Sequence, residues 1–155
     1  MPTPAAAATP LTALELGAWH GFLRVHAAVV RELEAELLAA HDLPLSSYEV
    51  LLVLEGSPHG RLRMSELADS VLLSRSGITR LVDRLAAEGL IERVTCPSDA
   101  RGLYATLTER GRVRLLEARG THLAGVRRWF VRRLSDDELR SLAAAWERLE
   151  LEPGS

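Results

Sequence analysis

The side chains best suited to chemistry lie between residues 74 and 101, where arginine, serine and threonine gather. One face of a helix predicted over 74–88 carries Arg75, Ser76, Thr79, Arg80 and Asp83, with Arg84 at its flank. Guanidinium groups and short hydroxyls match the donors and acceptors that DNA bases present in the major groove. The other face has the i, i+3, i+4, i+7 spacing of an apolar stripe that packs on a core, formed by Ile78, Leu81, Val82 and Leu85. Every amphipathic surface helix has a solvated polar face, so this helix alone does not establish DNA binding.

The segments around this helix predict a helix-turn-helix followed by a β-hairpin. Residues 61–63 form a possible strand, Ser65 is expected to cap a helix over 66–70, and 71–73 form the turn. Gly89 suits the position just after a helix end. Strands are expected over 90–96 and 103–107, joined by a charged loop at 97–102. Leu103, Ala105 and Leu107 would then alternate onto one face of the second strand.

Long helices are predicted on both sides of this unit. Thr12 and Glu15 form a capping box that opens a helix to about residue 40, and the same pattern recurs at Ser46 with Glu49 and at Ser135 with Glu138. These two boxes open helices to about 55 and 149, and Thr108 would cap a helix over 109–133. The first helix is too long to be covered within one subunit, which suggests packing against a partner. Its apolar stripe comprises Leu16, Trp19, Leu23, Leu33 and Leu37, with Val30.

The fold class that follows is mainly α, with a winged helix-turn-helix lobe and a small β-hairpin wing. We expect a disordered tail at 1–10, a single domain at 11–150 and a short tail at 151–155. Within the domain, 46–108 would form the DNA-binding lobe, and 11–45 and 109–150 the long terminal helices used for dimerisation.

Composition is that of an ordinary globular chain, with 155 residues, 47% hydrophobic residues, 26% charged residues and a net charge of −2. The charge is uneven: Arg61–Arg114 holds ten arginines and seven acidic residues, whereas the remainder holds nine and fourteen. A basic module on an acidic body can still meet a phosphate backbone. No basic leader precedes an apolar segment and no apolar run approaches a membrane span, so we expect a cytoplasmic protein without membrane contact.

Two motifs resemble the multiple-antibiotic-resistance regulator (MarR) family of bacterial transcription factors. The stretch SRSGITRLVDRLAAEGLIER is similar to the family's recognition helix, and DARGLYATLTERG fits its wing pattern D-x-R-x-x-x-x-x-L-T through Asp99, Arg101, Leu107 and Thr108. The resemblance extends over about residues 11–150. It implies a homodimer, joined by the terminal helices, whose two lobes read a pseudo-palindromic operator in double-stranded DNA. Two recognition helices would then enter major grooves about 34 Å apart.

Within this framework each polar residue receives an expected role. We assign base edges and nearby phosphates to Arg75, Ser76, Thr79 and Arg80, with Ser74 supporting a phosphate at the helix N-terminus. Arg101 would contact the minor groove or backbone from the wing tip, and the resemblance implies that Asp99 orients it; a plain surface ion pair is the alternative. Further expected DNA-contacting residues are Arg63, Ser65, Gly77 and Arg84. Gly77 could equally allow close packing against the neighbouring helix or result from genomic drift, and Arg84 could have a structural role.

The resemblance also implies a crevice for a small-molecule effector. Trp19 and His20 on the first helix, and Tyr48, are the expected contacts for a small apolar or phenolic anion, although Trp19 could simply belong to the core. The five histidines lack metal-ligand spacing, and the single cysteine, Cys96, excludes a disulfide framework and is interpreted as a strand-end residue rather than a redox sensor. We therefore expect no metal and no cofactor.

The leading function is a ligand-responsive transcriptional regulator, usually a repressor in the family, that leaves its operator when the effector binds. An enzyme is not expected, because no nucleophile–base pair, glycine-rich phosphate loop or metal-site spacing is visible. The alternative is a winged helix used as a protein-interaction module without sequence-specific DNA binding. Salt-sensitive DNA binding separates the two.

Overall fold

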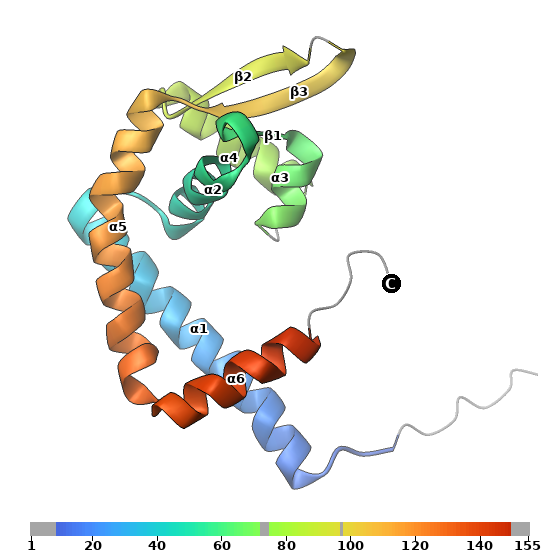
Figure 1. Cartoon of the computed structure of the whole chain (residues 1–155), viewed down its shortest axis with the longest axis vertical. Helices are drawn as coiled ribbons and strands as arrows, with labels where there is room; N and C mark the ends of the chain where they lie inside the picture. The colour runs from blue at the N-terminus through green and yellow to red at the C-terminus, as the bar shows by residue number, and fades with distance from the viewer. Residues whose placement is uncertain (1–8, 72–74, 97, 150–155) are drawn as a thin grey trace, which may run out of the picture.

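The structure is a computed structural model that describes residues 9–71, 75–96 and 98–149. Its elements are, in order, α1 (Ala13–His41), α2 (Leu45–Gly56), η1 (Pro58–Gly60), β1 (Arg61–Arg63), α3 (Met64–Ser70), α4 (Arg75–Ala87), β2 (Ile91–Cys96), β3 (Asp99–Leu107), α5 (Glu109–Trp129), η2 (Val131–Arg133) and α6 (Asp136–Leu149). Elements α2 to β3 gather at one end, while α1 and α5 extend away from them and α6 crosses α1 (Figure 1). This order confirms the predicted winged helix between long terminal helices.

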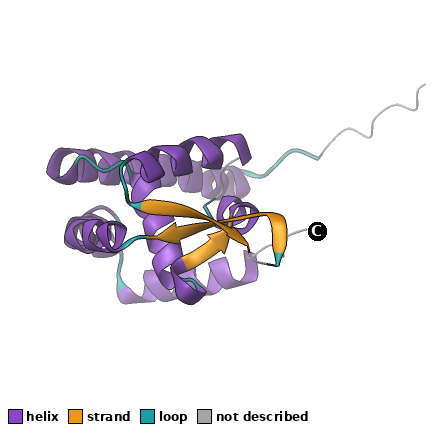
Figure 2. Cartoon of the chain, turned by 90° about the horizontal axis from the view of Figure 1, so that it is seen from above, coloured by secondary structure: helices purple, strands orange, loops and turns teal. Residues whose placement is uncertain are grey.

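A small antiparallel sheet closes the winged helix, with strand order β1–β3–β2. Figure 2 shows this sheet lying across the helices. Its inner face is buried at Ile91, Ala105 and Leu107. The prediction of a loop over 97–102 was wrong, because β3 already begins at Asp99, which pairs with Cys96. The hairpin therefore extends beyond the core, and Leu103 is 42% exposed instead of sharing the buried face.

One hydrophobic core joins the winged helix to the long helices. It is built from apolar side chains of every helix from α1 to α5 and of the sheet, including Leu37, Leu43, Leu51, Leu54, Leu67, Val82, Leu85, Ile91 and Leu115. The α6 helix contributes no buried residue. The core therefore fixes α4 and the sheet relative to α5 but leaves α6 outside it.

Three predicted helix starts are confirmed. The Glu15 carboxylate accepts a hydrogen bond from the Thr12 N–H at 2.7 Å, and that of Glu138 accepts one from the Ser135 N–H at 2.8 Å. These hydrogen bonds lower the pKa of both carboxyl groups. The Thr108 hydroxyl accepts from the Gly111 N–H at 3.0 Å at the start of α5.

Two other predicted caps were wrong, because other groups satisfy the backbone there. The α2 helix begins at Leu45 after Pro44, and the Leu45 N–H donates to Glu34 of α1 in place of a box between Ser46 and Glu49. Ser65 lies inside the first turn of α3 and does not cap it; the Arg63 N–H donates to Glu66 at 2.9 Å instead.

The ends of α4 and α5 differ in how closely they match the sequence prediction. Gly89 has φ +74°, and the N–H groups of Gly89 and Leu90 donate to Ala86 and Leu85 in a Schellman motif, which confirms the predicted helix end at Gly89. The α5 helix ends at Trp129, earlier than expected, and a 3₁₀ turn follows.

Within the described ranges no single helix is long and apolar enough to cross a membrane. The α1 and α2 helices together reach that length and apolarity, but an 86° bend separates them.

Candidate nucleic-acid interface

The α4 helix has the two faces that its sequence predicts. Its apolar stripe is buried, with Ile78 at 1%, Val82 at 0% and Leu85 at 0% exposure. Thr79 and Arg80 are exposed on the other face. Arg75 and Ser76 lie in the first turn of α4, Gly77 is half-buried beside them, and Ser74 lies outside the described residues. The helix can therefore present its polar face to a large partner while its apolar face holds it in the core.

Two polar residues of α4 attach it to neighbouring elements. The Asp83 carboxylate pairs with Arg93 of β2 at 2.7 Å. The Arg84 guanidinium donates to the hydroxyl of Ser47, a buried residue of α2, at 2.9 Å. The structural role that the sequence left open for Arg84 is thus present in the structure. Both contacts hold α4 in a fixed orientation relative to the sheet and to α2.

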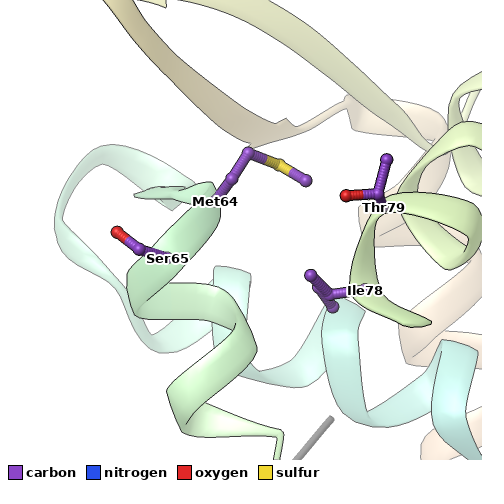
Figure 3. A pocket seen from close by; sticks show the side chains of 4 residues that line it. All are labelled: Met64, Ser65, Ile78 and Thr79. Carbon is purple, nitrogen blue, oxygen red and sulfur yellow. The ribbon is translucent and has the colours of Figure 1, made fainter. Parts of the chain in front are cut away.

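A notch separates α3 from α4 on this surface. It encloses about 450 Å³ and is lined by Met64, Ser65, Ile78 and Thr79. Met64 extends across the notch towards Thr79, whereas the Ser65 hydroxyl points away from α4 (Figure 3). The predicted contact residue Ser65 is exposed and lies close to the polar face of α4, so the structure brings these two predicted regions together.

The predicted wing residues lie at the far end of the hairpin. Asp99 and Arg101 are both in β3, next to the turn at Ser98, and not in a loop. The register between β2 and β3 is irregular at Thr95 and Cys96, just before this turn. The hairpin therefore projects both residues beyond the buried part of the sheet.

An aromatic contact on β1 and β3 was missed by sequence reasoning. The Cζ atoms of Arg61 and Arg63 lie 4.9 Å and 5.8 Å from the centroid of the Tyr104 ring. Arg63 is also the register partner of Tyr104 across the sheet. The alternation in Arg-Leu-Arg could have shown that both arginines share one strand face, but the pairing of β1 with β3 could not be read from the sequence.

The three predicted effector residues do not come together within one chain. Trp19 is 52% exposed on α1 and its ring lies 6.0 Å from that of Phe22. Tyr48 is buried, and its ring stacks on His122 at 4.4 Å. Trp19 precedes Glu34, the α1 residue that contacts the start of α2, by 15 positions, or about 22 Å along the helix. His20 is exposed next to Trp19.

Tyr48 and His122 form a polar–aromatic junction between α2 and α5. Burial raises the pKa of Tyr48, and the nearby Arg119 opposes the shift. Burial also lowers the pKa of His122. Arg119 pairs with Glu55 of α2, and His41 bonds to Thr121 at 2.8 Å.

Within the part of the chain that the structure describes, no three His, Cys, Asp or Glu side chains are grouped to hold a metal ion.

The arrangement of α2 to β3 is that of a winged helix-turn-helix protein, and comparison with known proteins assigns its family. A model of the MarR family matches residues 41–102. The structure is similar to AbsC, a MarR family transcriptional regulator from Streptomyces coelicolor, with 34% identity, TM-score 0.84, and coverage of 92% of this chain and 95% of AbsC. It is also similar to Sco3205, a MarR family transcriptional regulator from the same organism solved in complex with DNA, with 31% identity, TM-score 0.87, and coverage of 96% and 94%. The chain belongs to the MarR family of transcriptional regulators.

Curated relatives agree with this assignment over shorter segments. The transcriptional repressor MprA of Escherichia coli strain K12 is 33% identical over 76 residues, which are 49% of this chain and 43% of MprA. An HTH-type transcriptional regulator of Bacillus cereus is 32% identical over 111 residues, 72% of each chain. The chain thus spans less than half the length of MprA but most of the Bacillus protein.

Proposed function

We propose that the protein is a dimeric transcriptional repressor that binds a pseudo-palindromic operator in the cytoplasm and leaves it when a small effector binds. The observation that carries DNA binding is the exposed polar face of α4, where Thr79 lines the notch beside α3 and Arg80 is exposed, on a helix anchored by its buried stripe. The likeness to Sco3205, whose structure contains DNA, supports the same reading.

The residue roles proposed from the sequence are retained on this surface. Arg75, Ser76, Thr79 and Arg80 read bases and nearby phosphates, with Gly77 allowing close approach. Ser65 and Arg63 contact phosphates beside α3, and Ser74 does so before α4. Arg101, oriented by Asp99, contacts the minor groove or backbone from the end of the hairpin. Arg84 acts mainly through its hydrogen bond to Ser47, which positions α4.

Dimerisation through residues 11–45 and 109–150 is supported by apolar surface on the long helices. Leu23 of α1 is 43% exposed, Leu123 of α5 is 44% exposed and Trp146 of α6 is 42% exposed. Large apolar side chains that remain exposed together on neighbouring elements mark an interaction surface. A second copy that covers it would place two α4 helices on one side of the duplex.

The effector class we propose is a small apolar or phenolic anion. Within one chain, Tyr48 lies apart from Trp19 and His20, so such a ligand would contact all three only if the dimer brings them together. Near Tyr48, the aromatic stack with His122 and the adjacent Arg119 cation offer the chemistry that a phenolic anion needs. The effector can shift DNA affinity only by its differential affinity for two conformations.

Fluorescence anisotropy on DNA flanking the protein's own gene tests the proposal. We expect tight binding that resists unrelated competitor DNA and weakens steeply with salt. Weak binding that is equal on both DNAs would favour the protein-interaction module, once a genome-wide DNA selection also finds no preferred site. The same assay, run with a panel of aromatic acids, tests for effector release.

A further inference from the structure

The outer face of the sheet carries two arginines gathered on one tyrosine ring. Arg61 and Arg63 of β1 lie with their Cζ atoms 4.9 Å and 5.8 Å from the Tyr104 ring centroid of β3. We propose that Tyr104 is a positioning residue that holds Arg61 and Arg63 as a two-cation clamp for neighbouring DNA backbone phosphates. This inference rests on the proposed function, because it adds a contact surface to a DNA-binding protein.

Strand geometry places the three side chains on the same face. Alternation in β1 turns Leu62 towards the core and Arg61 and Arg63 away from it. Ala105 is fully buried in β3, so its neighbour Tyr104 faces outwards and meets Arg63 as its register partner. Arg61 is exposed, which leaves it accessible to a partner molecule.

The strand that carries the two arginines leads directly into the notch beside α4. Arg63 directly precedes α3, and the next two residues, Met64 and Ser65, line the notch whose other wall includes Thr79. Under this proposal, a duplex that contacts Thr79 and Arg80 extends past the notch to the outer face of β1, where its backbone meets the two arginines. Phosphate contacts of this kind fix the position of a recognition helix along the duplex.

A tyrosine ring suits this task for a physical reason. Two guanidinium groups two residues apart repel each other, and the negative face of one ring attracts both. A guanidinium stacked on a ring keeps its edge N–H groups available for bidentate bonds to phosphate. Holding the cations in place before binding lowers the ordering cost of the contact.

Two neighbouring residues carry carboxylates that an arginine of the clamp could pair with instead of phosphate. Glu66 accepts the Arg63 backbone N–H, and Glu92 pairs with Thr106 in register, on the side of β3 opposite Arg61. If either carboxylate held an arginine permanently, removal of that arginine would leave DNA binding unchanged. The two possibilities therefore differ in one measurable result: removal of an arginine weakens DNA binding only if that arginine contacts phosphate.

The test is the salt dependence of operator binding by the full chain, measured by fluorescence anisotropy for wild type, Tyr104→Leu, Tyr104→Phe, Arg61→Gln and Arg63→Gln. The logarithm of the association constant falls linearly with the logarithm of the salt concentration, and each lost phosphate contact decreases the magnitude of this slope by about 0.9. We expect that decrease for either arginine variant. Tyr104→Leu, which changes no charge, should lower the slope by a similar amount and weaken binding by about five- to thirtyfold, the equivalent of two exposed cation–π contacts. Tyr104→Phe, which keeps the ring, should match wild type within about twofold.

Arg140→Gln on α6 is the matched control, because Arg140 is exposed and pairs with Asp137 of its own helix; the slope should be unchanged in a variant that light scattering shows to have the wild-type mass. A wild-type slope in Tyr104→Leu or in Arg61→Gln overturns the clamp while leaving DNA binding intact. Absence of specific binding by wild type overturns the proposed function itself. Circular dichroism melts check folding; if Tyr104→Leu does not fold, the exposed Arg61→Gln variant alone decides the outcome.

Discussion

At the scale of single residues, the polar face of α4 divides into two groups. Asp83 and Arg84 are engaged by Arg93 and Ser47 and hold the helix in place. Thr79 and Arg80 are exposed on the same face and are the residues proposed to contact DNA. Substitutions in the two groups should therefore have different signatures, one in protein stability and one in DNA affinity.

Replacing Arg80 by alanine should reduce operator affinity and relax base preference. A bidentate contact to a base contributes about 1–3 kcal/mol of discrimination, so affinity for the operator should fall more than affinity for unrelated DNA. Anisotropy with both DNAs measures the difference. Ser47→Ala is the contrasting variant: it should cost about 1 kcal/mol in urea unfolding through the lost hydrogen bond, with little change in base preference. Equal specificity of Arg80→Ala and wild type would remove Arg80 from the base-reading set.

His122 should make the stability of the fold sensitive to acid. Its ring stacks on Tyr48, its Nδ1 is buried without a described hydrogen-bond partner, and burial lowers its pKa from the ordinary 6.5. A lowered folded-state pKa means that the unfolded state binds the proton more tightly. The free energy of unfolding is therefore unaffected by His122 above pH 6.5, where the ring is neutral in both states, and it decreases as the pH falls from 6.5 towards the folded-state pKa.

Urea unfolding between pH 8 and pH 5 measures this effect. The His122→Phe variant keeps an aromatic partner for Tyr48 and should lose less stability over this range than wild type does. Tyr48→Phe keeps the histidine and the stack, so it should retain the acid sensitivity. Parallel curves for wild type and His122→Phe would show that His122 does not contribute to it.

At the scale of elements, the start of α5 is held against the winged helix by close backbone packing. A Cβ added to Gly111 would lie 2.1 Å from the carbonyl oxygen of Leu90 and 2.7 Å from Cδ1 of Leu107. Backbone cannot move as a flexible side chain can. The approach of α5 to the β2–β3 hairpin therefore requires glycine at this position.

Gly111→Ala should destabilise the protein by roughly 3 kcal/mol or more, because overpacking against backbone forces α5 and the sheet apart. Gly120→Ala on the same helix is the matched control, since no atom lies within 4 Å of its added Cβ. It should stabilise the protein by about 0.5–1 kcal/mol through helix propensity. Denaturant unfolding of both variants checks the pair, and comparable stability for the two would contradict the packing argument.

At the scale of the whole molecule, a single chain leaves apolar surface on each long helix. The α6 helix has no buried residue, and its Trp146 contacts Phe22 of α1 with ring centroids 5.6 Å apart. Both rings are still more than 40% exposed. A second copy would cover this surface, and DNA binding would depend on it because each half-site needs its own α4.

Leu123→Glu should convert a dimer into a monomer and weaken operator binding strongly. The side chain is 44% exposed on α5, so a charge there is tolerated in the isolated chain but not in an apolar interface. Light scattering after size exclusion gives the mass. Leu52→Glu on α2, where the leucine is 38% exposed, is the matched control and should remain dimeric. A monomeric wild-type protein would contradict the dimer directly.

Elements whose signals are local could be predicted from the amino-acid sequence. The apolar spacing of α4, the capping boxes at Thr12 and Ser135, and the Gly89 helix end depend on residues within a few positions of one another, and the structure confirms each. The same spacing identified the exposed polar face of α4. Side-chain type and helical period suffice for such features.

Features that join distant segments of the chain depend on tertiary packing and could not be predicted from local patterns. Ser46 and Ser65 have sequence patterns of caps, yet Glu34 of the preceding helix and the Arg63–Glu66 contact satisfy the backbone there. The pairing of Arg63 with Tyr104 depends on sheet register, and the Arg84–Ser47 bond on how α4 packs against α2. A local pattern can offer a hydrogen bond, but the packing of the whole chain determines which partner is close enough to accept it.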